Sequence, residues 1–469
     1  MRVLLLGFDG ADWHLTNKLM KEGKLQNFSK LAERGIVAPL KSVVPPISPP
    51  AWASIVTGVN PGKHGVYEFT EFNRKSFSIR IRPNPIKAKK IWNYLNEAGY
   101  RSIIINFPLM YPPEKINGIT ISGLITPSTA RYFTYPKYLT DKLKNMGYEV
   151  EISEVEIFRL LYSDKEKLYN RLVQVMKKRA EISVELLARE DWDFSMVVFG
   201  GTDRIQHFFW NEPEKIRQCY IEMDKVLKLF VGQVVDSDTV LMVISDHGFR
   251  GIYKYFYINS WLYKKGLLSL KSRAKKINAR EKILRLLNKL RIGKFLNYVP
   301  ESLGKIIPAS KIQVSDVDPT KTRACCVSGY GYLILNGNWD FLNKAKLKDE
   351  LLGIVDPESG ERVVKSVLEK KEIFSGKYLS YAPDLVLIPN NGYFFQDKYL
   401  SNKLFDKPKN APGLAKRFGD HSDTGIFLCS GKKMKSQNVV SVYDITPTIL
   451  SLYDLNRDMD DYFDGRILG

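Results

Sequence analysis

The sequence predicts an α/β protein built on a mostly parallel sheet that is covered on both faces. Short, continuous apolar runs of strand length recur along the chain, and segments of helical length separate them. The 469 residues are 44% hydrophobic and 12% aromatic, which is enough for a large core. Alternation of this kind is typical of a sheet with helices on each side.

The expected elements follow one another in this order. We expect strands at Arg2–Phe8, 101–107, Phe194–Phe199, 240–245, Tyr332–Leu335, 384–388 and 425–429. We expect helices at 16–34 with a break at Gly23, from Ala51 to Thr57, at 87–99, at Lys165–Arg189, from Asp203 to Trp210, and at 216–231. The prolines between 45 and 50 indicate a loop before the second of these helices.

Residues 253–319 interrupt this alternation. The segment contains the run 283–290, in which the apolar positions 283, 284, 287 and 290 follow helical spacing. We therefore predict a catalytic core formed by 1–252 and 320–469, with 253–319 as a partly helical insertion or cap. Packing of this helix onto the core is the commoner outcome, and contact with a membrane surface is the alternative.

The positive charge of the chain is unevenly placed. The formal net charge is +20, and residues 268–311 hold twelve Lys or Arg against two Glu, a net charge of +10. Such a segment attracts an anionic membrane surface, a lipid headgroup or a polyanionic substrate, although a solvated lysine-rich face has the same composition. We find no nucleic-acid-binding motif beside it.

The N-terminus and the cysteines indicate the compartment. The first apolar run meets Asp9 and Asp12 too early for a signal peptide, and no apolar run reaches the length of a membrane span. The four cysteines show no CxxC spacing, so we expect reduced core residues. These features predict a cytoplasmic protein, with attachment to the periphery of a membrane as an option.

Histidine is scarce, and three of the five histidines occupy positions suited to metal binding. His207 lies four residues after Asp203, His247 directly follows Asp246, and His421 directly follows Asp420. Residues at i and i+4 share a helix face, so the first pair can reach one ion.

Most of the candidate ligands lie where an α/β sheet places its active site. Asp9, Asp203 and Asp246 each come at or just after the carboxyl end of an expected strand. A single aspartate there is often a helix cap, and a lone histidine is more often a buried, hydrogen-bonded residue than a ligand. Their joint occurrence favours two divalent ions, with zinc first and manganese as an alternative, because carboxylate and imidazole together suit such metals.

Ser48 is a candidate nucleophile. It lies in a proline-rich loop that runs straight into a helix, where backbone N–H groups favour an anion and a lowered hydroxyl pKa. A serine in this place is also a common helix cap, and without the metals that would be the preferred interpretation.

The combined motifs resemble a known family. They are Gly7-Phe8-Asp9-Gly10, Ser48 to Gly58 followed by Asn60 to Gly65, Asp203 with His207, Ser245-Asp246-His247-Gly248, Gly419-Asp420-His421, Asp444 to Leu450, and Asp464-Gly465-Arg466. In this order they resemble the alkaline phosphatase superfamily, and within it the type I phosphodiesterase/nucleotide pyrophosphatase family. The resemblance implies an alkaline-phosphatase-like three-layer sandwich and a phosphoester or nucleotide substrate.

The resemblance also implies which candidate residues would hold each metal and which would act as the nucleophile. Asp9, Ser48, Asp246 and His247 would hold one metal, and Asp203, His207 and His421 would hold the other. Ser48 would attack phosphorus, and water would hydrolyse the resulting phosphoserine.

Two departures from the family pattern bear on specificity. Many relatives carry threonine at the nucleophile, where this chain has Ser48, and place an asparagine about 21 residues beyond it, where this chain has Phe69. An amide contact from that position to the phosphoryl oxygens is therefore not expected, and the diesterase specificity that the family implies stays open. Trp52 stands where a sulfatase would have arginine, and His14 and His64 are expected to be structural.

The favoured interpretation is a metal-dependent phosphodiesterase. A phosphomonoesterase or phosphomutase on the same scaffold is the closest alternative. A nucleic-acid- or membrane-binding protein with structural metals is the alternative from another class.

Overall fold

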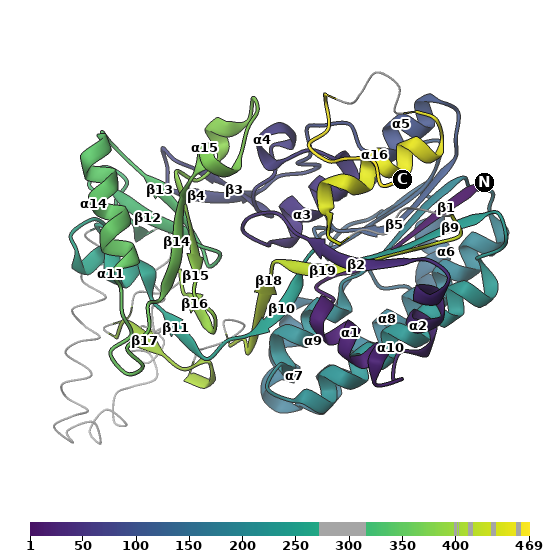
Figure 1. The fold of residues 1–469 in the computed structure, drawn as a ribbon, viewed down its shortest axis with the longest axis horizontal. Coiled ribbons are helices and arrows are strands. Elements are labelled where there is room, and N and C mark those ends of the chain that lie inside the picture. Colours follow the sequence, from purple (N-terminus) through teal and green to yellow (C-terminus); the bar gives the residue numbers. More distant parts are fainter. Residues whose placement is uncertain (272–315, 398–400, 402, 411–415, 433–437, 456–460) are drawn as a thin grey trace.

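The computed structural model describes residues 1–271, 316–397, 401, 403–410, 416–432, 438–455 and 461–469. Two lobes lie side by side in Figure 1. The larger contains a nine-stranded sheet with helices on both faces, and the smaller contains a four-stranded sheet.

The large sheet has the order β20-β2-β19-β9-β1-β8-β5-β6-β7. Its bounds are β1 (Arg2–Phe8), β2 (Ile36–Lys41), β5 (Ser102–Phe107), β6 (Gly118–Ser122), β7 (Thr134–Tyr135), β8 (Phe194–Phe199), β9 (Thr239–Ile244), β19 (Thr424–Ser430) and β20 (Val440–Ser441). The pairs among β9, β1, β8, β5 and β6 are all parallel, whereas β19 runs antiparallel to both β9 and β2. The mostly parallel sheet is thus confirmed.

Helices cover both faces of this sheet, as expected for a three-layer sandwich. One layer includes α1 (Trp13–Lys21), α2 (Gln26–Glu33), α6 (Leu139–Asn145), α7 (Glu154–Ser163), α8 (Lys165–Arg189), α9 (Gly201–Phe209) and α10 (Pro213–Gln233). The other includes α3 (Ser48–Thr57), α5 (Ile91–Glu97) and α16 (Ile445–Leu452). In β1, Leu4 and Leu6 join the first core while Val3 and Leu5 join the second, because successive side chains point to opposite faces.

Helix α3, which begins at the candidate nucleophile Ser48, packs directly on β1. A Cβ atom on Gly7 would lie 2.4 Å from the Trp52 ring, so only glycine allows this ring to approach the strand. Trp52 is fully buried. This contact fixes the position of Ser48, which begins the same helix.

Two expected helices differ in detail from the prediction. The stretch 16–34 is divided at Gly23 as expected, where a φ of +68° favours glycine, but α1 begins three residues earlier than predicted, at Trp13. Helix α3 begins at Ser48 rather than at Ala51, because Pro49 and Pro50 occupy first-turn positions that need no N–H hydrogen bond.

The smaller lobe contains strands that the sequence predicted without their partners. Its sheet has the order β12-β13-β15-β14, with β12 (Ala324–Ser328), β13 (Tyr332–Leu335), β14 (Val364–Glu369) and β15 (Leu385–Pro389), all antiparallel. The expected strands at 332–335 and 384–388 therefore exist but lie outside the large sheet. A buried apolar run does not reveal its partner, so alternation alone could not separate the two sheets.

Shorter elements complete the two lobes. They are α4 (Pro61–His64), β3 (Thr70–Asn73), β4 (Ser78–Ile81), β10 (Gly248–Gly251), β11 (Lys254–Phe256), α11 (Ile258–Lys264), α14 (Phe341–Leu352), α15 (Lys370–Ile373), β16 (Tyr393–Phe395), β17 (Phe405–Asp406) and β18 (Gly419–Ser422). Within the described residues, short 3₁₀ helices span Leu379–Tyr381, Pro408–Asn410 and Val442–Asp444.

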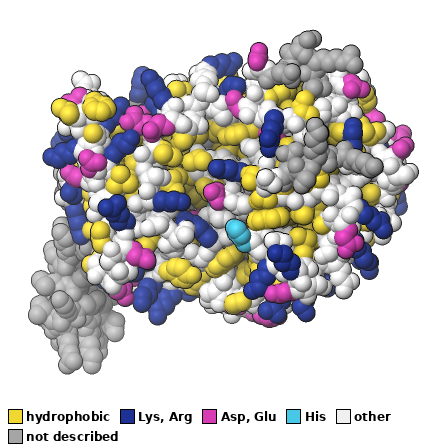
Figure 2. All heavy atoms as spheres, viewed as in Figure 1, with side chains coloured by type: hydrophobic (Ala, Val, Ile, Leu, Met, Phe, Trp, Pro, Cys, Tyr) yellow, Lys and Arg dark blue, Asp and Glu magenta, His cyan; other side chains and the backbone are white. Residues whose placement is uncertain are grey.

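Most of the predicted insertion, including the run 283–290, falls outside the described residues, so the division into a core and an insertion at 253–319 stays a prediction. None of the described helices combines the length and the hydropathy that a membrane crossing requires. On the face shown in Figure 2, Lys and Arg side chains lie over both lobes with Asp and Glu among them. All four cysteines are free and buried.

Candidate active site

The candidate ligands gather at the carboxyl edge of the large sheet. Asp9 follows β1, Asp203 lies in the first turn of α9 after β8, and Asp246 follows β9. His421 arrives from a distant part of the sequence on β18, where it is paired with Phe249 of β10. The structure therefore brings all seven predicted residues into one region, as expected at this edge of a parallel sheet.

The first group surrounds the hydroxyl of Ser48. Its Oγ lies 3.0 Å from Nε2 of His247 and 3.4 Å from Oδ1 of Asp9. The same His247 Nε2 lies 3.3 Å from Oδ2 of Asp246 and 3.5 Å from Oδ1 of Asp9. All four side chains are buried. Ser48, Asp9, Asp246 and His247 are thus within reach of a single ion.

The second group is equally compact. Oδ1 of Asp203 lies 3.2 Å from Nε2 of His207 and 3.2 Å from Nε2 of His421, and these two nitrogens are also 3.2 Å apart. The rings of His421 and His247 stack with centroids 3.6 Å apart, so the two groups adjoin. Because of this stacking, the candidate ligand atoms also form the sets Asp203, His247, His421 and Asp9, Asp246, His247.

In each of the three histidines, the hydrogen bond made by Nδ1 determines which ring nitrogen carries the proton. Nδ1 of His207, His247 and His421 lies 2.9, 3.0 and 2.8 Å from the carbonyl oxygens of Gly419, Gly248 and Pro46. A carbonyl can only accept, so each neutral ring carries its proton on Nδ1 and presents an unprotonated Nε2 to the site. This orientation by a backbone carbonyl is typical of metal-binding histidines.

Asp9 and Asp246 are hard to ionise, whereas His207 and His421 outweigh the effect of burial and lower the pKa of Asp203. Burial, together with repulsion from Asp246 and Asp203, raises the pKa of Asp9 well above its usual value. Burial likewise raises the pKa of Asp246 to about 8, although the Gly10 N–H opposes the shift. Burial, together with repulsion from His421, lowers the pKa of His247 to about 4, so this ring stays neutral. The site therefore gathers buried carboxylate and imidazole acceptors, with the charge of Arg417 near Asp203.

The surroundings of two carboxylate oxygens indicate whether the site suits a metal. Oδ1 of Asp203 and Oδ2 of Asp246 are buried and have no hydrogen-bond donor. Lone pairs of imidazole and carboxylate that converge at 3.2–3.5 Å repel one another unless a cation lies between them. The donor set of carboxylate, imidazole and hydroxyl therefore fits divalent metals.

Several supporting residues were not foreseen. Nε1 of Trp52 donates to Oδ2 of Asp9 at 2.9 Å, and Tyr330 places its hydroxyl 3.2 Å from Nε2 of His421. Trp52 lies four residues after Ser48, so helical spacing could have indicated it. Tyr330 comes from the smaller lobe, and no sequence pattern connects it to the site.

The remaining histidines lie outside the two groups of candidate ligands. His14 is exposed, and His64 is fully buried beside Ser54. Nδ1 of His64 accepts from the N–H of Val66, so its Nε2 carries the proton and donates to the Ser54 hydroxyl at 3.0 Å. Burial lowers the pKa of His64 to about 3. This Ser-His pair therefore has no free base and is structural.

Comparison with known proteins identifies the family of the chain. The family model described as type I phosphodiesterase/nucleotide pyrophosphatase matches residues 3–422. The chain belongs to this family. As a member it is a phosphoester hydrolase, and no curated protein matches the chain in sequence.

Solved structures show the same fold as this family member. Phosphonoacetate hydrolase from Sinorhizobium meliloti 1021, in complex with phosphonoformate, has a TM-score of 0.64 at 14% identity, covering 97% of this chain and 95% of that one. Human ectonucleotide pyrophosphatase/phosphodiesterase 5 has a TM-score of 0.54 at 13% identity, covering 100% and 97%. An inactive variant of the murine enzyme, in complex with AMP, has a TM-score of 0.55 at 14% identity, covering 97% and 95%.

Proposed function

We propose that this family member is a phosphodiesterase that depends on two divalent metals and acts through a covalent phosphoserine at Ser48. One observation carries the proposal: the Ser48 hydroxyl lies 3.0 Å from an unprotonated histidine nitrogen, inside a buried cluster of carboxylates that needs cations. Asp9, Ser48, Asp246 and His247 would hold one metal, and Asp203, His207 and His421 the other. Zinc suits these ligands best, and manganese is the alternative.

The bound metals would supply a lowered hydroxyl pKa at the nucleophile and charge stabilisation on the phosphoryl oxygens. The chain itself orients the reacting groups. Trp52 holds Asp9 in place, and the backbone carbonyls of Gly248, Pro46 and Gly419 fix the three imidazole rings. These contacts hold the site in its working geometry before substrate arrives.

Ser48 begins α3, so the positive end of the helix dipole favours negative charge beside its oxygen, although Pro49 and Pro50 have no N–H to donate. In the first step the Ser48 oxygen bonds to phosphorus and its proton passes to solvent, while the bond to one ester oxygen breaks and that oxygen takes up a proton and leaves as the alcohol. In the second step water attacks the phosphoserine, and the Ser48 hydroxyl is restored. The burial of Ser48 limits competing reactions with bulk water.

One cation supports a second candidate function. Although burial opposes it, interactions with Tyr330, Asp203 and Asp420 raise the pKa of Arg417, which places its charge near the second metal group. A guanidinium there could bind the extra charge of a phosphate monoester. A phosphomonoesterase or phosphomutase therefore remains the alternative on this scaffold.

A paired assay tests both candidates. Hydrolysis of a chromogenic phosphodiester and of a phosphomonoester is measured with added zinc or manganese, for the native chain and for Ser48→Ala. We expect faster turnover of the diester, loss of activity in the variant, and retention of most of the bound metal. Full activity of Ser48→Ala would reject the nucleophile assignment, and faster turnover of the monoester would favour the alternative.

Three finer expectations stay predictions. A nucleotide substrate is suggested by the murine relative with AMP and by the description of the family. The cytoplasmic location and the contact of segment 253–319 with an anionic surface rest on sequence composition alone. Salt-sensitive binding to anionic vesicles, with no turnover of any ester, would favour the binding-protein class instead.

A further inference from the structure

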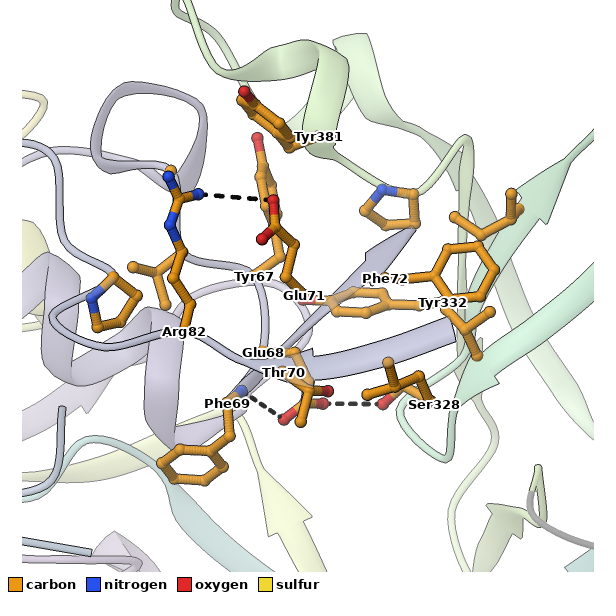
Figure 3. Close-up of a pocket in the computed structure, with 17 residues that line it drawn as sticks. Tyr67, Glu68, Phe69, Thr70, Glu71, Phe72, Arg82, Ser328, Tyr332 and Tyr381 are labelled. Atoms are coloured by element: carbon orange, nitrogen blue, oxygen red, sulfur yellow. Dashed lines mark hydrogen bonds and ion pairs between the residues drawn. The ribbon is translucent and has the colours of Figure 1, made fainter. Parts of the chain in front are cut away.

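A pocket lies where the two lobes meet. One wall comes from residues between 65 and 85, around the β3–β4 hairpin, and the other from residues between 327 and 334 and between 381 and 383 of the smaller lobe. Its cavity volume is about 80 Å³. Glu68 and Phe69 lie on the first wall (Figure 3). The pocket therefore contains the position at which many relatives place an asparagine.

The pocket adjoins the metal ligands through a short chain of contacts. Tyr330, which contacts His421, donates its backbone N–H to Oγ of Ser328 at 3.3 Å. Ser328 in turn donates to Oε2 of Glu68 at 3.0 Å. Ser328 and Glu68 both line the pocket. The identity of the residue after Glu68 can therefore affect the site.

Phe69 has no donor to offer a phosphoryl group. Its ring packs against the core cluster that contains Trp52. Its backbone N–H donates to Oε1 of Glu68 at 3.0 Å, as a dashed line in Figure 3 marks. The position that supplies an amide in many relatives is thus apolar in this chain, and its backbone donor is already used.

The first turn of α3 does not replace that donor. Pro49 and Pro50 have no N–H, and the N–H of Ala51 donates to the carbonyl oxygen of Ile47 at 3.1 Å. Backbone donors are therefore scarce beside the Ser48 hydroxyl. A further partner for the negative charge on the phosphoryl oxygens has to come from another part of the chain.

Arg417 lies in the segment that holds the second group of candidate ligands together. The N–H of the next residue, Phe418, donates to the carbonyl oxygen of His207 at 2.8 Å, and Nδ1 of His207 lies 2.9 Å from the carbonyl oxygen of Gly419. The buried hydroxyl of Tyr255 donates to the Arg417 carbonyl oxygen at 2.7 Å and accepts from the Arg417 N–H at 2.8 Å. The contacts around His207 thus also fix the backbone of Arg417.

The side chain of Arg417 faces the candidate ligands. Nζ of Lys416 lies 6.0 Å from the ring centroid of Phe418, so the side chains of these two residues share one side of the chain. Arg417, between them, faces the opposite side. Its guanidinium interacts there with Tyr330 and with the carboxylate of Asp203.

The Tyr330 hydroxyl connects this guanidinium to a nitrogen of the second group. It lies 3.2 Å from Nε2 of His421, and the centroids of the two rings are 4.9 Å apart. Nδ1 of the same histidine lies 2.8 Å from the carbonyl oxygen of Pro46, in the loop before Ser48. Arg417 is therefore placed beside the second group, on a path of contacts that leads to the nucleophile loop.

The charge of Arg417 is available to a ligand. Although burial opposes ionisation, interactions with Tyr330 and Asp203 raise the pKa of Arg417, so the guanidinium stays charged. No carboxylate of the described residues forms an ion pair with it, and Asp420 pairs with Arg250 at 3.3 Å. The side chain is partly exposed, so a substrate can reach it.

We propose that Arg417 binds a phosphoryl oxygen of the substrate, in place of the amide that Phe69 does not supply. The planar guanidinium offers paired N–H donors, which match two oxygens of one phosphoryl group. The contact strengthens as charge builds up on these oxygens during attack by Ser48, and it therefore lowers the barrier to phosphoryl transfer. The inference rests on the proposed function and adds a substrate-binding residue to that same site.

The test measures hydrolysis of bis(p-nitrophenyl) phosphate and of p-nitrophenyl phosphate by the full chain with added metal. In Arg417→Ala we expect kcat/KM for the diester to fall by about 100-fold, with a similar loss for the monoester, because both esters carry the phosphoryl oxygens. Arg417→Lys replaces the fork of donors with a point charge and should lose about tenfold. An unchanged kcat/KM for the diester, or a loss confined to the monoester, would overturn the proposal.

Lys416→Ala is the matched control. It removes one positive charge from the neighbouring residue, whose ammonium lies 6.0 Å from the ring centroids of Tyr162 and Phe418. Turnover of the diester should be unchanged, and a loss equal to that of Arg417→Ala would show that net charge alone acts. Metal content measured by atomic emission should be native in every variant. A fall in metal content in Arg417→Ala would mean that the arginine supports the ligands and does not bind substrate.

The hydrogen bonds between Tyr255 and residue 417 involve the backbone of residue 417, so they survive these substitutions. Arg417→Gln, which keeps a long side chain without the charge, serves if Arg417→Ala does not fold. The same loss of about 100-fold is expected for the diester. Native turnover by Arg417→Gln would reject the assignment.

Binding of inorganic phosphate separates failure of this inference from failure of the proposed function. If the native chain hydrolyses neither ester, the proposed function is wrong, and calorimetric titration of the metal-loaded full chain with inorganic phosphate still decides the role of Arg417. Affinity about tenfold weaker in Arg417→Ala, but unchanged in Lys416→Ala, would support the inference. Equal affinity in the native chain and Arg417→Ala, or no binding, would reject it.

Discussion

The ligand cluster and the pocket beside it are encoded in the sequence in different ways. The aspartates of the cluster each follow a strand of one sheet, so the topology of that sheet brings them together. The pocket takes one wall from residues near 70 and the other from residues near 330, and no periodicity relates them. The cluster can thus be predicted from the order of strands in the sequence, whereas the pocket cannot.

The largest effect should come from breaking the cluster itself. Asp203→Ala removes the carboxylate that lies 3.2 Å from both His207 and His421. We expect turnover of a phosphodiester to fall by at least about a thousandfold, because one metal and its charge stabilisation are lost. Metal content measured by atomic emission should fall as well.

Glu68→Gln should leave metal content unchanged, which keeps the two regions separate. Full metal content in Asp203→Ala would mean that this carboxylate is not a ligand.

A decrease in pH should have the second-largest effect, through the metal affinity of the cluster. The raised pKa of Asp246, about 8, means that below this pH a metal must displace a proton from the carboxylate. His247, with its pKa near 4, stays neutral and contributes nothing over this range. Because the pKa of Asp9 is raised as well, metal affinity should fall by at least about tenfold per pH unit from 8 to 6.

The stability of the metal-free protein should change with pH in the opposite direction to the metal affinity. A pKa raised on folding stabilises the fold at low pH, and this stabilisation is lost as the pH rises through about 8. The Tm of the metal-free chain should fall from pH 6 to pH 9, while the Tm increase caused by metal should grow. A metal-induced shift that is constant across this range would contradict the raised pKa.

Trp52 connects the cluster to the rest of the fold, and its replacement should lower metal affinity less than loss of a ligand does. Trp52→Phe removes the N–H that donates to Asp9 at 2.9 Å but keeps an aromatic ring against Gly7. We expect metal affinity to fall by about 10- to 100-fold, as for other residues that orient ligands. Trp92→Phe is the control, since Trp92 is equally buried and its Nε1 donates to Glu114 instead.

Equal losses of metal affinity in the two tryptophan variants would show that packing alone, rather than the hydrogen bond to Asp9, is responsible.

The sequence reached the cluster because its signals are local. Asp9, Asp203 and Asp246 come at strand ends, and the pair of Asp203 and His207 follows helical spacing. His421 required the order of motifs in the family, since β18 reaches the site only by pairing with β10. Helix α3 begins three residues earlier than the sequence predicts, because two prolines in its first turn resemble a loop.

The smaller lobe shows where such signals end. The apolar runs at 332–335 and 384–388 predicted strands, but their antiparallel pairing in a second sheet depends on tertiary contacts. Tyr330 and Glu68 carry no motif, and only the approach of the two lobes brings Tyr330 to His421.

The smallest effect should come from Tyr330, the residue that joins the two regions. Its hydroxyl lies 3.2 Å from Nε2 of His421, and the Nδ1–H of that ring already donates a hydrogen bond to the carbonyl oxygen of Pro46. The tyrosine therefore donates to the lone pair that a metal would use, and the hydrogen bond competes with the metal. Tyr330→Phe should bind metal about fivefold more tightly, which corresponds to the loss of one ordinary hydrogen bond.

Tyr332→Phe, in the neighbouring strand β13, is the control for the loss of a buried hydroxyl in the same lobe. Competition titration with a chromogenic chelator measures both variants. Weaker metal binding by Tyr330→Phe would instead show that the hydroxyl supports the ligand set, and the two regions would then act as one unit.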